Sequence, residues 1–378
     1  MNSGAADRPW RQLFSAGRKD LLTPGPRMVD EFECVASVLL AIAFGHLADV
    51  QNYSWAAFSG YMVMRGHISD SLLRGVLRIV GTIAGALLAL VVTPMVWTSA
   101  SASAVALALV GGGMLYAALT AKRSYAWLFV GLTFAMVLLD KIENPQDAVS
   151  AFASTRMKET VAGTAACILV SMLSTFTLRR RWPDPPRPPA AGVGWHRDAA
   201  RHARQGAIAL AVLPFIWLTF GVPQLSQAAV TIMALMLIPV SGIGKSGLIA
   251  VGRRIVLRAG GCAFGAALAA AFLFLAHATT HAVVPVLIAG TVLGVMVGRH
   301  IENGQSTIAY AGTQFTLAIL VTLVPDSYAH AEIEPGIARL TGVAVGIFLL
   351  LPVLVGWHLV AGATGEPPSD GPVERGGI

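Results

Sequence analysis

Long apolar stretches separated by short polar intervals fill the chain from about residue 32 to residue 360. Twelve of these stretches have the length and character of helices, and they fall into two sets of six. Because runs of this kind recur from end to end, the pattern predicts an all-α integral membrane protein with about 12 transmembrane helices. The first set covers residues 32–48, 52–65, 72–94, 100–119, 124–140 and 149–177, and the second covers 203–220, 224–240, 248–276, 281–298, 306–324 and 337–360.

The polar intervals predict a division of the chain into five parts. A cytoplasmic N-terminal segment (1–30) precedes a first six-helix repeat (31–178). A basic, proline-rich cytoplasmic linker (179–202) then leads to a second six-helix repeat (203–360). The Gly/Pro-rich tail (361–378) is expected to be disordered.

Composition supports the membrane assignment and excludes several other classes. The chain is 55% hydrophobic and only 12% charged, about half the charged fraction of a soluble domain. The net charge of +7 lies in short loops rather than on one face, so it does not indicate nucleic-acid binding. The cysteines lie scattered in apolar stretches without metal-ligand spacing, and no metal or other cofactor is predicted.

The placement of charge predicts the topology. If the N-terminus is cytoplasmic, the basic residues fall in the even-numbered loops, as the positive-inside rule requires. Among the odd-numbered loops, 95–99, 221–223 and 277–280 carry no Lys or Arg, while 140–147 and 325–336 are net acidic. This predicts a multi-pass protein of the bacterial inner membrane with both termini in the cytoplasm. An even number of helices in each half also makes the two repeats parallel.

Two arginine-containing motifs recur about 180 residues apart. RGVLRIVGTIAG (74–85) returns as RIVLRAGGCAFG (254–265), with six of twelve positions identical, and RMKETVAG (156–163) resembles RLTGVAVG (339–346). In the fifth helix of each set, Tyr125 with LTFAMV (132–137) resembles Tyr310 with FTLAIL (315–320). Three matches at nearly constant offset indicate an internal repeat.

The repeated arginines and glycines share one face of their helices, because they are spaced by three or four residues. The glycines allow close helix packing, and the arginines extend the same seam as a path for an anion. Alternatively, the arginines near the helix ends reach to lipid headgroups, or the sixth and twelfth helices begin only near Val161 and Leu340. The candidate substrate-binding residues are Arg74, Arg78, Arg156, Arg254, Arg258 and Arg339, and the candidate packing residues are Gly81, Gly85, Gly163, Gly261, Gly265 and Gly346.

Carboxylates near these arginines have two interpretations. Glu159 is either an ion-pair partner of Arg156 or a group that couples transport to protons, and Asp140 is a second candidate for coupling. Glu31 and Glu33 are expected to stabilise the start of the first helix through its dipole. No catalytic triad, zinc motif or phosphate-binding loop is present, so no enzymatic activity is expected.

At these motifs the chain resembles the fusaric acid resistance and aromatic acid exporter superfamily, in its short two-repeat bacterial branch. The resemblance rests on a six-helix unit used twice, whose third helix carries arginines before Gly-Thr-x-x-Gly, as in Arg78, Gly81, Thr82 and Gly85. It covers residues 30 to 360, although Cys262 replaces the threonine in the second copy and the large cytoplasmic domain of many relatives is absent.

The resemblance implies export of hydrophobic organic anions, such as aromatic carboxylates, with a periplasmic membrane-fusion adaptor as a partner and a homo-oligomer as one possible assembly. Plant malate channels look like distant half-size relatives with an arginine-lined pore. We therefore expect an ion-gradient-driven exporter in which the arginines attract the carboxylate while Trp55, Trp127 and Phe315 bind the ring. The alternatives are a passive organic-anion channel, a non-transport membrane scaffold and a lipid-modifying enzyme.

Overall fold

The computed structural model describes residues 25–184, 194–244, 246–279, 282–304, 307–328 and 331–363. Within these ranges, a helix lies at each of the twelve predicted positions and no strand is present. The first set is α2 (Pro26–Leu47), α3 (Tyr53–Val63), α4 (Ile68–Val96), α5 (Ala100–Ala106) continued through the π-helical turn η1 (Leu107–Gly111) into α6 (Gly112–Thr120), α7 (Ser124–Glu143) and α8 (Val149–Phe176). The second set is α10 (Arg197–Phe220), α11 (Leu225–Met236), α12 (Leu248–Ala278), α13 (Val283–Glu302), α14 (Ala309–Leu323) and α15 (Glu334–Ala363); the short α9 (Leu178–Arg181) and η2 (Val240–Gly242) connect longer helices.

Eight helices of the described residues are long and apolar enough to cross a membrane. They are α4, the continuous α5–η1–α6, α7, α8, α10, α12, α13 and α15. The apolar helices α11 and α14 are shorter, with 12 and 15 residues, and α3 has only 11. The first turns of α2 carry three acidic residues, which interrupt its apolar run. The chain is therefore a multi-pass membrane protein, and length and composition support a complete crossing for eight of its helices.

The two sets of helices pack in corresponding ways. In the first set α4 packs on α7 and α3 on α8, and in the second set α12 packs on α14 and α11 on α15. Contacts between the sets also correspond, because α7 lies against α11 and α14 lies against α3. Likewise, α2 contacts α13, while α10 contacts the continuous helix formed by α5 and α6. Each set therefore contributes equivalent helices to the interface.

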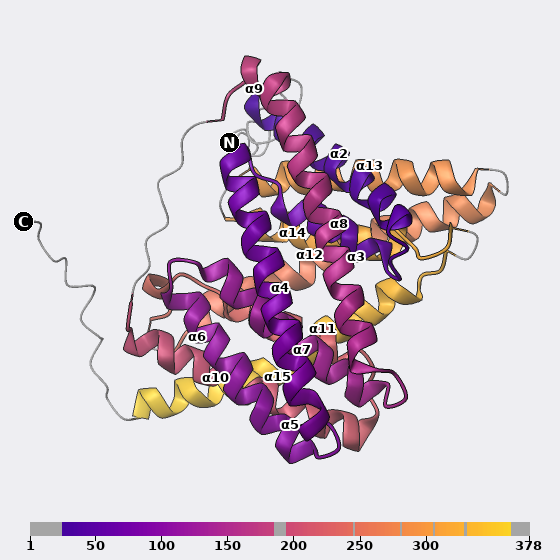
Figure 1. Cartoon of the computed structure of the whole chain (residues 1–378). Helices are drawn as coiled ribbons and strands as arrows, with labels where there is room; N and C mark the ends of the chain where they lie inside the picture. The colour runs from indigo at the N-terminus through magenta and orange to yellow at the C-terminus, as the bar shows by residue number, and fades with distance from the viewer. Residues whose placement is uncertain are drawn as a thin grey trace, which may run out of the picture.

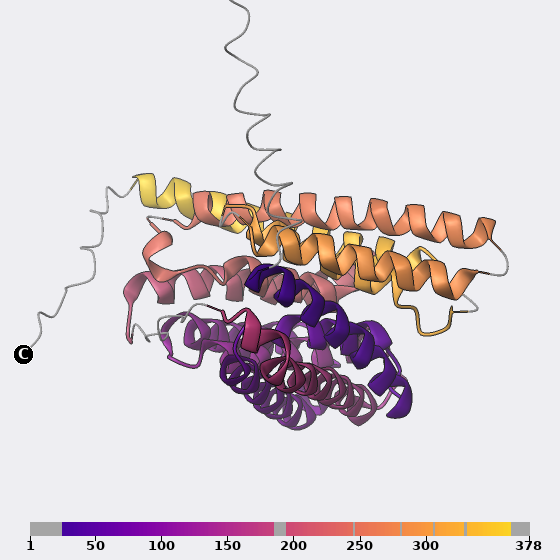
Figure 2. The ribbon, with the colours of Figure 1, turned by 90° about the horizontal axis from the view of Figure 1, so that it is seen from above.

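The sets form two layers whose long helices cross. In Figure 1, α4 and α8 run down the page whereas α12 and α13 run across it. Figure 2 shows the second set lying lengthwise above a first set that is seen closer to end-on. Helices α4, α8, α12 and α15 contain 28 to 31 residues, or about 42–46 Å at 1.5 Å per residue. This exceeds the roughly 30 Å of hydrocarbon, so helices of this length can cross while tilted.

Glycines make the closest helix contacts at equivalent positions of both sets. A Cβ atom on Gly81 would lie 2.5 Å from the carbonyl oxygen of Ala126, and one on Gly261 would lie 2.4 Å from that of Ala311. No side chain fits at such a distance, so the backbones themselves are in contact. The same relation holds for Gly85 with Val130, Gly265 with Phe315, Gly163 with Ala56 and Gly346 with Ala228.

These contacts also correct the alignment of the fifth helices. Since Val130 and Phe315 occupy the same place against their glycines, the structure pairs Leu132 with Leu317. The comparison of LTFAMV with FTLAIL paired Leu132 with Phe315 and was two residues out. Both segments are uniformly apolar, so their hydrophobicity alone does not fix the register.

Adjacent glycines of α12 provide a test of this packing. Leucine at position 261 must displace the α14 backbone, whereas a Cβ on Gly260 has nothing within 4 Å. We expect Gly261→Leu to lose most of its monodisperse folded protein, because overpacking against backbone costs about 1–3 kcal/mol or more. Gly260→Leu should stay close to wild type. Size-exclusion chromatography and thermal unfolding of the two purified variants measure the difference, and equal behaviour would contradict the close contact.

Two helices, α2 and α10, begin six residues earlier than the sequence predicted. Helix α2 begins at Pro26, so Glu31 and Glu33 lie beyond its first turn, and the prediction that they stabilise the helix start is wrong. Both are buried and bonded to basic side chains, Glu31 to His300 and Glu33 to Arg179. Helix α10 begins at Arg197 rather than residue 203, where the His196 ring accepts a hydrogen bond from the Asp198 backbone. Three segments lie outside the described residues: residues 1–24, the middle of the predicted linker (185–193) and most of the predicted tail (364–378).

Candidate anion-binding cavity

A cavity of about 270 Å³ lies between the two sets of helices. Its walls come from α3, α4, α7 and α8 of the first set and from α11, α12, α13, α14 and α15 of the second. It thus lies where the two layers meet. All six arginines singled out in the sequence line it, namely Arg74, Arg78, Arg156, Arg254, Arg258 and Arg339, together with Arg65 and the carboxylates Glu159 and Glu302.

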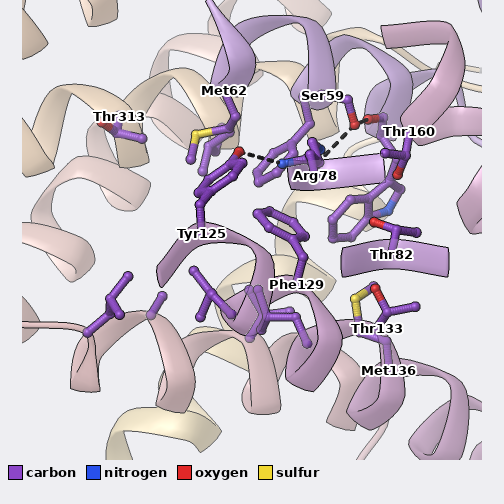
Figure 3. Close-up of a pocket in the computed structure, with 18 of the residues that line it drawn as sticks. Ser59, Met62, Arg78, Thr82, Tyr125, Phe129, Thr133, Met136, Thr160 and Thr313 are labelled. Atoms are coloured by element: carbon purple, nitrogen blue, oxygen red, sulfur yellow. Dashed lines mark hydrogen bonds between the residues drawn. The ribbon is translucent and has the colours of Figure 1, made fainter. Parts of the chain in front are cut away.

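Arg78 is held by side chains of two other helices, α3 and α7. Its Nη1 donates to the hydroxyl of Tyr125 at 3.1 Å, and its Nη2 donates to Ser59 Oγ at 3.0 Å. The guanidinium also lies 4.2 Å from the centre of the Phe129 ring, and Figure 3 shows it between Tyr125 and Ser59. Arg74, one turn earlier, lies 4.0 Å from the centre of the Tyr125 ring. One tyrosine therefore contacts both arginines of the repeated motif.

The second set repeats this arrangement around Arg258. Its Nη1 donates to the hydroxyl of Tyr310 at 3.2 Å, and its Nη2 donates to Thr231 Oγ1 at 3.0 Å. Arg254 lies 4.2 Å from the centre of the Tyr310 ring. The difference is at Gln314, whose Oε1 accepts a further bond from Arg258 at 2.8 Å. Both deeper arginines are thus fixed in place with little freedom to move.

The other two arginines enter the cavity from α8 and α15. These helices begin at Val149 and Glu334, so the alternative that they begin near Val161 and Leu340 is wrong. Arg156 forms an ion pair with Glu159 at 2.7 Å, and its guanidinium carbon lies 4.4 Å from the centre of the Trp55 ring. Arg339 makes a long bond of 3.5 Å to the Gln227 amide oxygen. All six arginines therefore line the cavity.

The cavity carries more positive than negative charge. Seven arginines line it, and its two carboxylates are already engaged: Glu159 pairs with Arg156, and Glu302 accepts from Tyr61 at 2.6 Å and pairs with Arg299 at 3.3 Å. Burial, the nearby Arg74 and then Arg299 lower the pKa of the Arg65 guanidinium, in the loop before α4, to about 10. That cation still persists at neutral pH. Buried positive charge of this kind favours an anion.

A second cavity of about 490 Å³ adjoins the first on the predicted external side. The two share Trp55, Met136 and Arg156. The outer cavity is polar, and its acidic residues are Asp140, Glu143 and Asp147. The Asp140 carboxylate accepts a bond of 3.2 Å from the Asn144 side chain. Arg156 therefore lies where an acidic outer cavity meets a basic inner one.

Acidic side chains bind the starts of the two short helices across the interface. Glu143, at the end of α7, accepts from the backbone N–H of Gln224 at 3.2 Å, next to α11. Asp326, after α14, accepts from the backbone N–H of Tyr53 at 3.3 Å, at the start of α3. A carboxylate at a helix N-terminus is favourable because of the helix dipole and the free N–H groups there. Each set therefore fixes the short helix of the other.

The aromatic lining differs from the sequence prediction. Trp55 lines the cavity, but Trp127 is 40% exposed and Phe315 packs in a separate apolar cluster, so the prediction is wrong for these two. The rings that line the cavity with Trp55 are Phe58, Phe129 and the two tyrosines. Phe129 lies four residues after Tyr125, and this spacing on one helix face is the signal that could have identified it.

A network of ion pairs joins α2 to α13 at the predicted cytoplasmic side. It was not predicted from the sequence. Asp30 accepts two hydrogen bonds from Arg299 and lies 3.5 Å from Nη2 of Arg179. Arg179 also donates to both oxygens of Glu33. Although Arg179 was assigned to a polar linker, it is only 8% exposed. The network therefore links the first set, the start of the linker and the second set.

Comparisons with known proteins agree with this architecture. Residues 40–170 match a family model described as fusaric acid resistance protein-like. This range includes α3 to α7 and most of α8, and with them Arg74, Arg78 and Arg156. The searches of curated proteins and of solved structures found no match. The family match confirms, over residues 40–170, the predicted resemblance to the fusaric acid resistance superfamily.

Proposed function

We propose that this protein exports hydrophobic organic anions, such as aromatic carboxylates, through the central cavity. The observation that carries the proposal is the convergence of six repeated arginines on one cavity that also contains aromatic rings. Guanidinium groups remain charged in an environment of low dielectric constant and bind carboxylates through paired hydrogen bonds. Aromatic and aliphatic side chains beside them suit an apolar ring.

The proposal treats the chain as two parallel six-helix repeats (31–178 and 203–360). Equivalent helix pairings, glycine contacts and arginine–tyrosine clusters in the two sets support this division. Both termini are cytoplasmic and the membrane is the bacterial inner membrane. The anion then enters near Arg74 and Arg254, passes Arg78 and Arg258, and leaves past Arg156 and Arg339 into the acidic outer cavity.

An energy source is required for export against a gradient, and the proposed source is an ion gradient. Arginine does not titrate in the physiological range, so proton coupling would rest on a carboxylate. Glu159 is the first candidate because it is 1% exposed and paired with a cavity arginine. Asp140 in the outer cavity is the second.

The family description and the cavity point to similar substrates. Fusaric acid, named in that description, is an aromatic carboxylic acid with an alkyl chain, and such a molecule combines one anionic group with a large apolar surface. Onward transfer by a periplasmic adaptor of the membrane-fusion class is part of the proposal, and an assembly of several copies is compatible with it.

The test is uptake or release of a radiolabelled aromatic carboxylate by proteoliposomes containing the full chain. We expect flux at least tenfold above empty liposomes, and accumulation against the carboxylate gradient when a proton gradient is imposed. Flux that only follows the electrochemical gradient would favour the passive channel instead. Proteoliposomes with correctly inserted protein and no flux of any organic anion would contradict a transport role and leave the scaffold alternative.

A further inference from the structure

We infer that the cavity is polarised, so that a substrate binds with its carboxylate on the wall formed by the second set and its ring on the wall formed by the first. This inference rests on the proposed function and assigns the orientation of the substrate. The second-set wall is defined as Arg254, Arg258, Arg339 and Gln314, and the first-set wall as Trp55, Phe58 and Phe129, all of which line the cavity.

The two walls occupy equivalent positions but differ in chemistry. Ser59 and Thr231 accept the same bond from Arg78 and Arg258, which fixes the correspondence of α3 with α11. By that correspondence Trp55 is equivalent to Gln227. Tyr125 and Tyr310 likewise align α7 with α14, and Phe129 becomes equivalent to Gln314. Aromatic rings of the first set therefore occupy the positions that amides occupy in the second set.

One pair of equivalent arginines also differs: the arginine of the first set has a carboxylate partner, and, in the described part of the chain, that of the second set does not. Arg156 of the first set is paired with Glu159 at 2.7 Å. Its equivalent Arg339 has no carboxylate within 4 Å among the described residues, and Gly342 takes the place of the glutamate. A Cβ on Gly342 would lie 2.4 Å from the Gln227 Cβ, so the packing of α15 on α11 leaves no room for an acidic side chain. At this pair of equivalent positions, the second wall therefore keeps a buried positive charge without the counter-charge that the first set provides.

The surroundings of the arginines reinforce this difference. Arg78 lies 4.2 Å from the centre of the Phe129 ring and 5.2 Å from that of Phe58, so rings cover its faces. Arg258 is instead held by the oxygen of Gln314 at 2.8 Å. With that oxygen turned to the guanidinium, the amide N–H groups of Gln314 are left to donate to another acceptor. A carboxylate therefore finds both charge and hydrogen-bond donors on the second wall.

The experiment measures binding of 1-naphthoate to the purified full chain in nanodiscs by isothermal titration calorimetry. Arg339→Gln should raise the Kd at least tenfold, because it removes charge that nothing else compensates. The double variant R156Q/E159Q removes an equivalent arginine together with its counter-charge and should raise the Kd by less than threefold. Equal weakening by the two variants would overturn the polarised cavity while leaving the proposed function in place.

A second pair of variants keeps the test decisive if Arg339→Gln does not fold. Gln314→Leu should weaken 1-naphthoate and butyrate alike, because it removes a partner of the carboxylate. Phe129→Leu should weaken 1-naphthoate at least fivefold and butyrate less than twofold, since it removes only a contact to the ring. The reverse pattern would overturn the inference. If the wild type binds neither anion, the polarised cavity and the proposed function both fail.

Discussion

The double variant R78Q/R258Q is expected to lose carboxylate flux by on the order of a hundredfold while still inserting into the membrane. Both side chains are almost fully buried, with exposures of 3% and 1%, and both line the cavity. Glutamine keeps a hydrogen-bond donor but removes the charge, and each charge-assisted bond contributes about 1.5–3 kcal/mol. Loss of such bonds as the anion binds at Arg258 and passes Arg78 along the path accounts for the expected effect.

The control is R123Q/R253Q, which removes two arginines whose side chains are exposed and do not line the cavity. It should keep flux within twofold of wild type in the same proteoliposome assay. R78K/R258K keeps the charge but not the planar geometry, and an intermediate flux is expected. Unchanged flux in R78Q/R258Q, with equal amounts of inserted protein, would remove these arginines from the transport path.

The positions of the helices and the arginines could be predicted because both depend on local pattern. Apolar length located the twelve helices, and the repeated spacing of Arg74, Arg78, Gly81 and Gly85 identified one helix face. The structure places that face against the neighbouring helix, with backbone contact at the glycines and the arginines in the cavity. Spacing on a helix is preserved on folding, so this part of the site is visible in the sequence.

Contacts between distant helices could not be predicted from the sequence in the same way. Gln227 and Gln314 were passed over as site residues because their importance depends on arginines that lie on other helices. The start of α2 was placed too late for a related reason. Hydropathy treats Asp30, Glu31 and Glu33 as polar positions outside the membrane, but basic partners from α9 and α13 allow them to be buried.

The variant Asp30→Asn is expected to lower the free energy of unfolding by about 3–5 kcal/mol, which is the usual cost of removing one member of a buried ion pair. Asp30 is 5% exposed, and it accepts two hydrogen bonds from Arg299 and one of 2.6 Å from the Asn303 side chain. Asparagine leaves Arg299 buried without the charge of Asp30. Its amide N–H group also points toward a hydrogen-bond donor, because, among the residues described, Asp30 accepts only from Arg299 and the Asn303 side chain. Unfolding in mixed detergent micelles, followed by circular dichroism, measures the loss. Glu332→Gln, at an exposed position, is the control and should change little.

A second variant shows whether the lost stability comes from the ion pair or from general damage to α2. In D30N/R299Q neither member of the pair remains, so no uncompensated cation is buried at that point, and part of the lost stability should return. Arg179 keeps Glu33 at 2.6 Å in this variant, so the link from α9 to α2 is preserved. Additive losses from the two substitutions would mean that the pair does not couple α2 to α13. A coupling energy above about 1 kcal/mol would instead show that this buried pair connects the two layers that enclose the cavity.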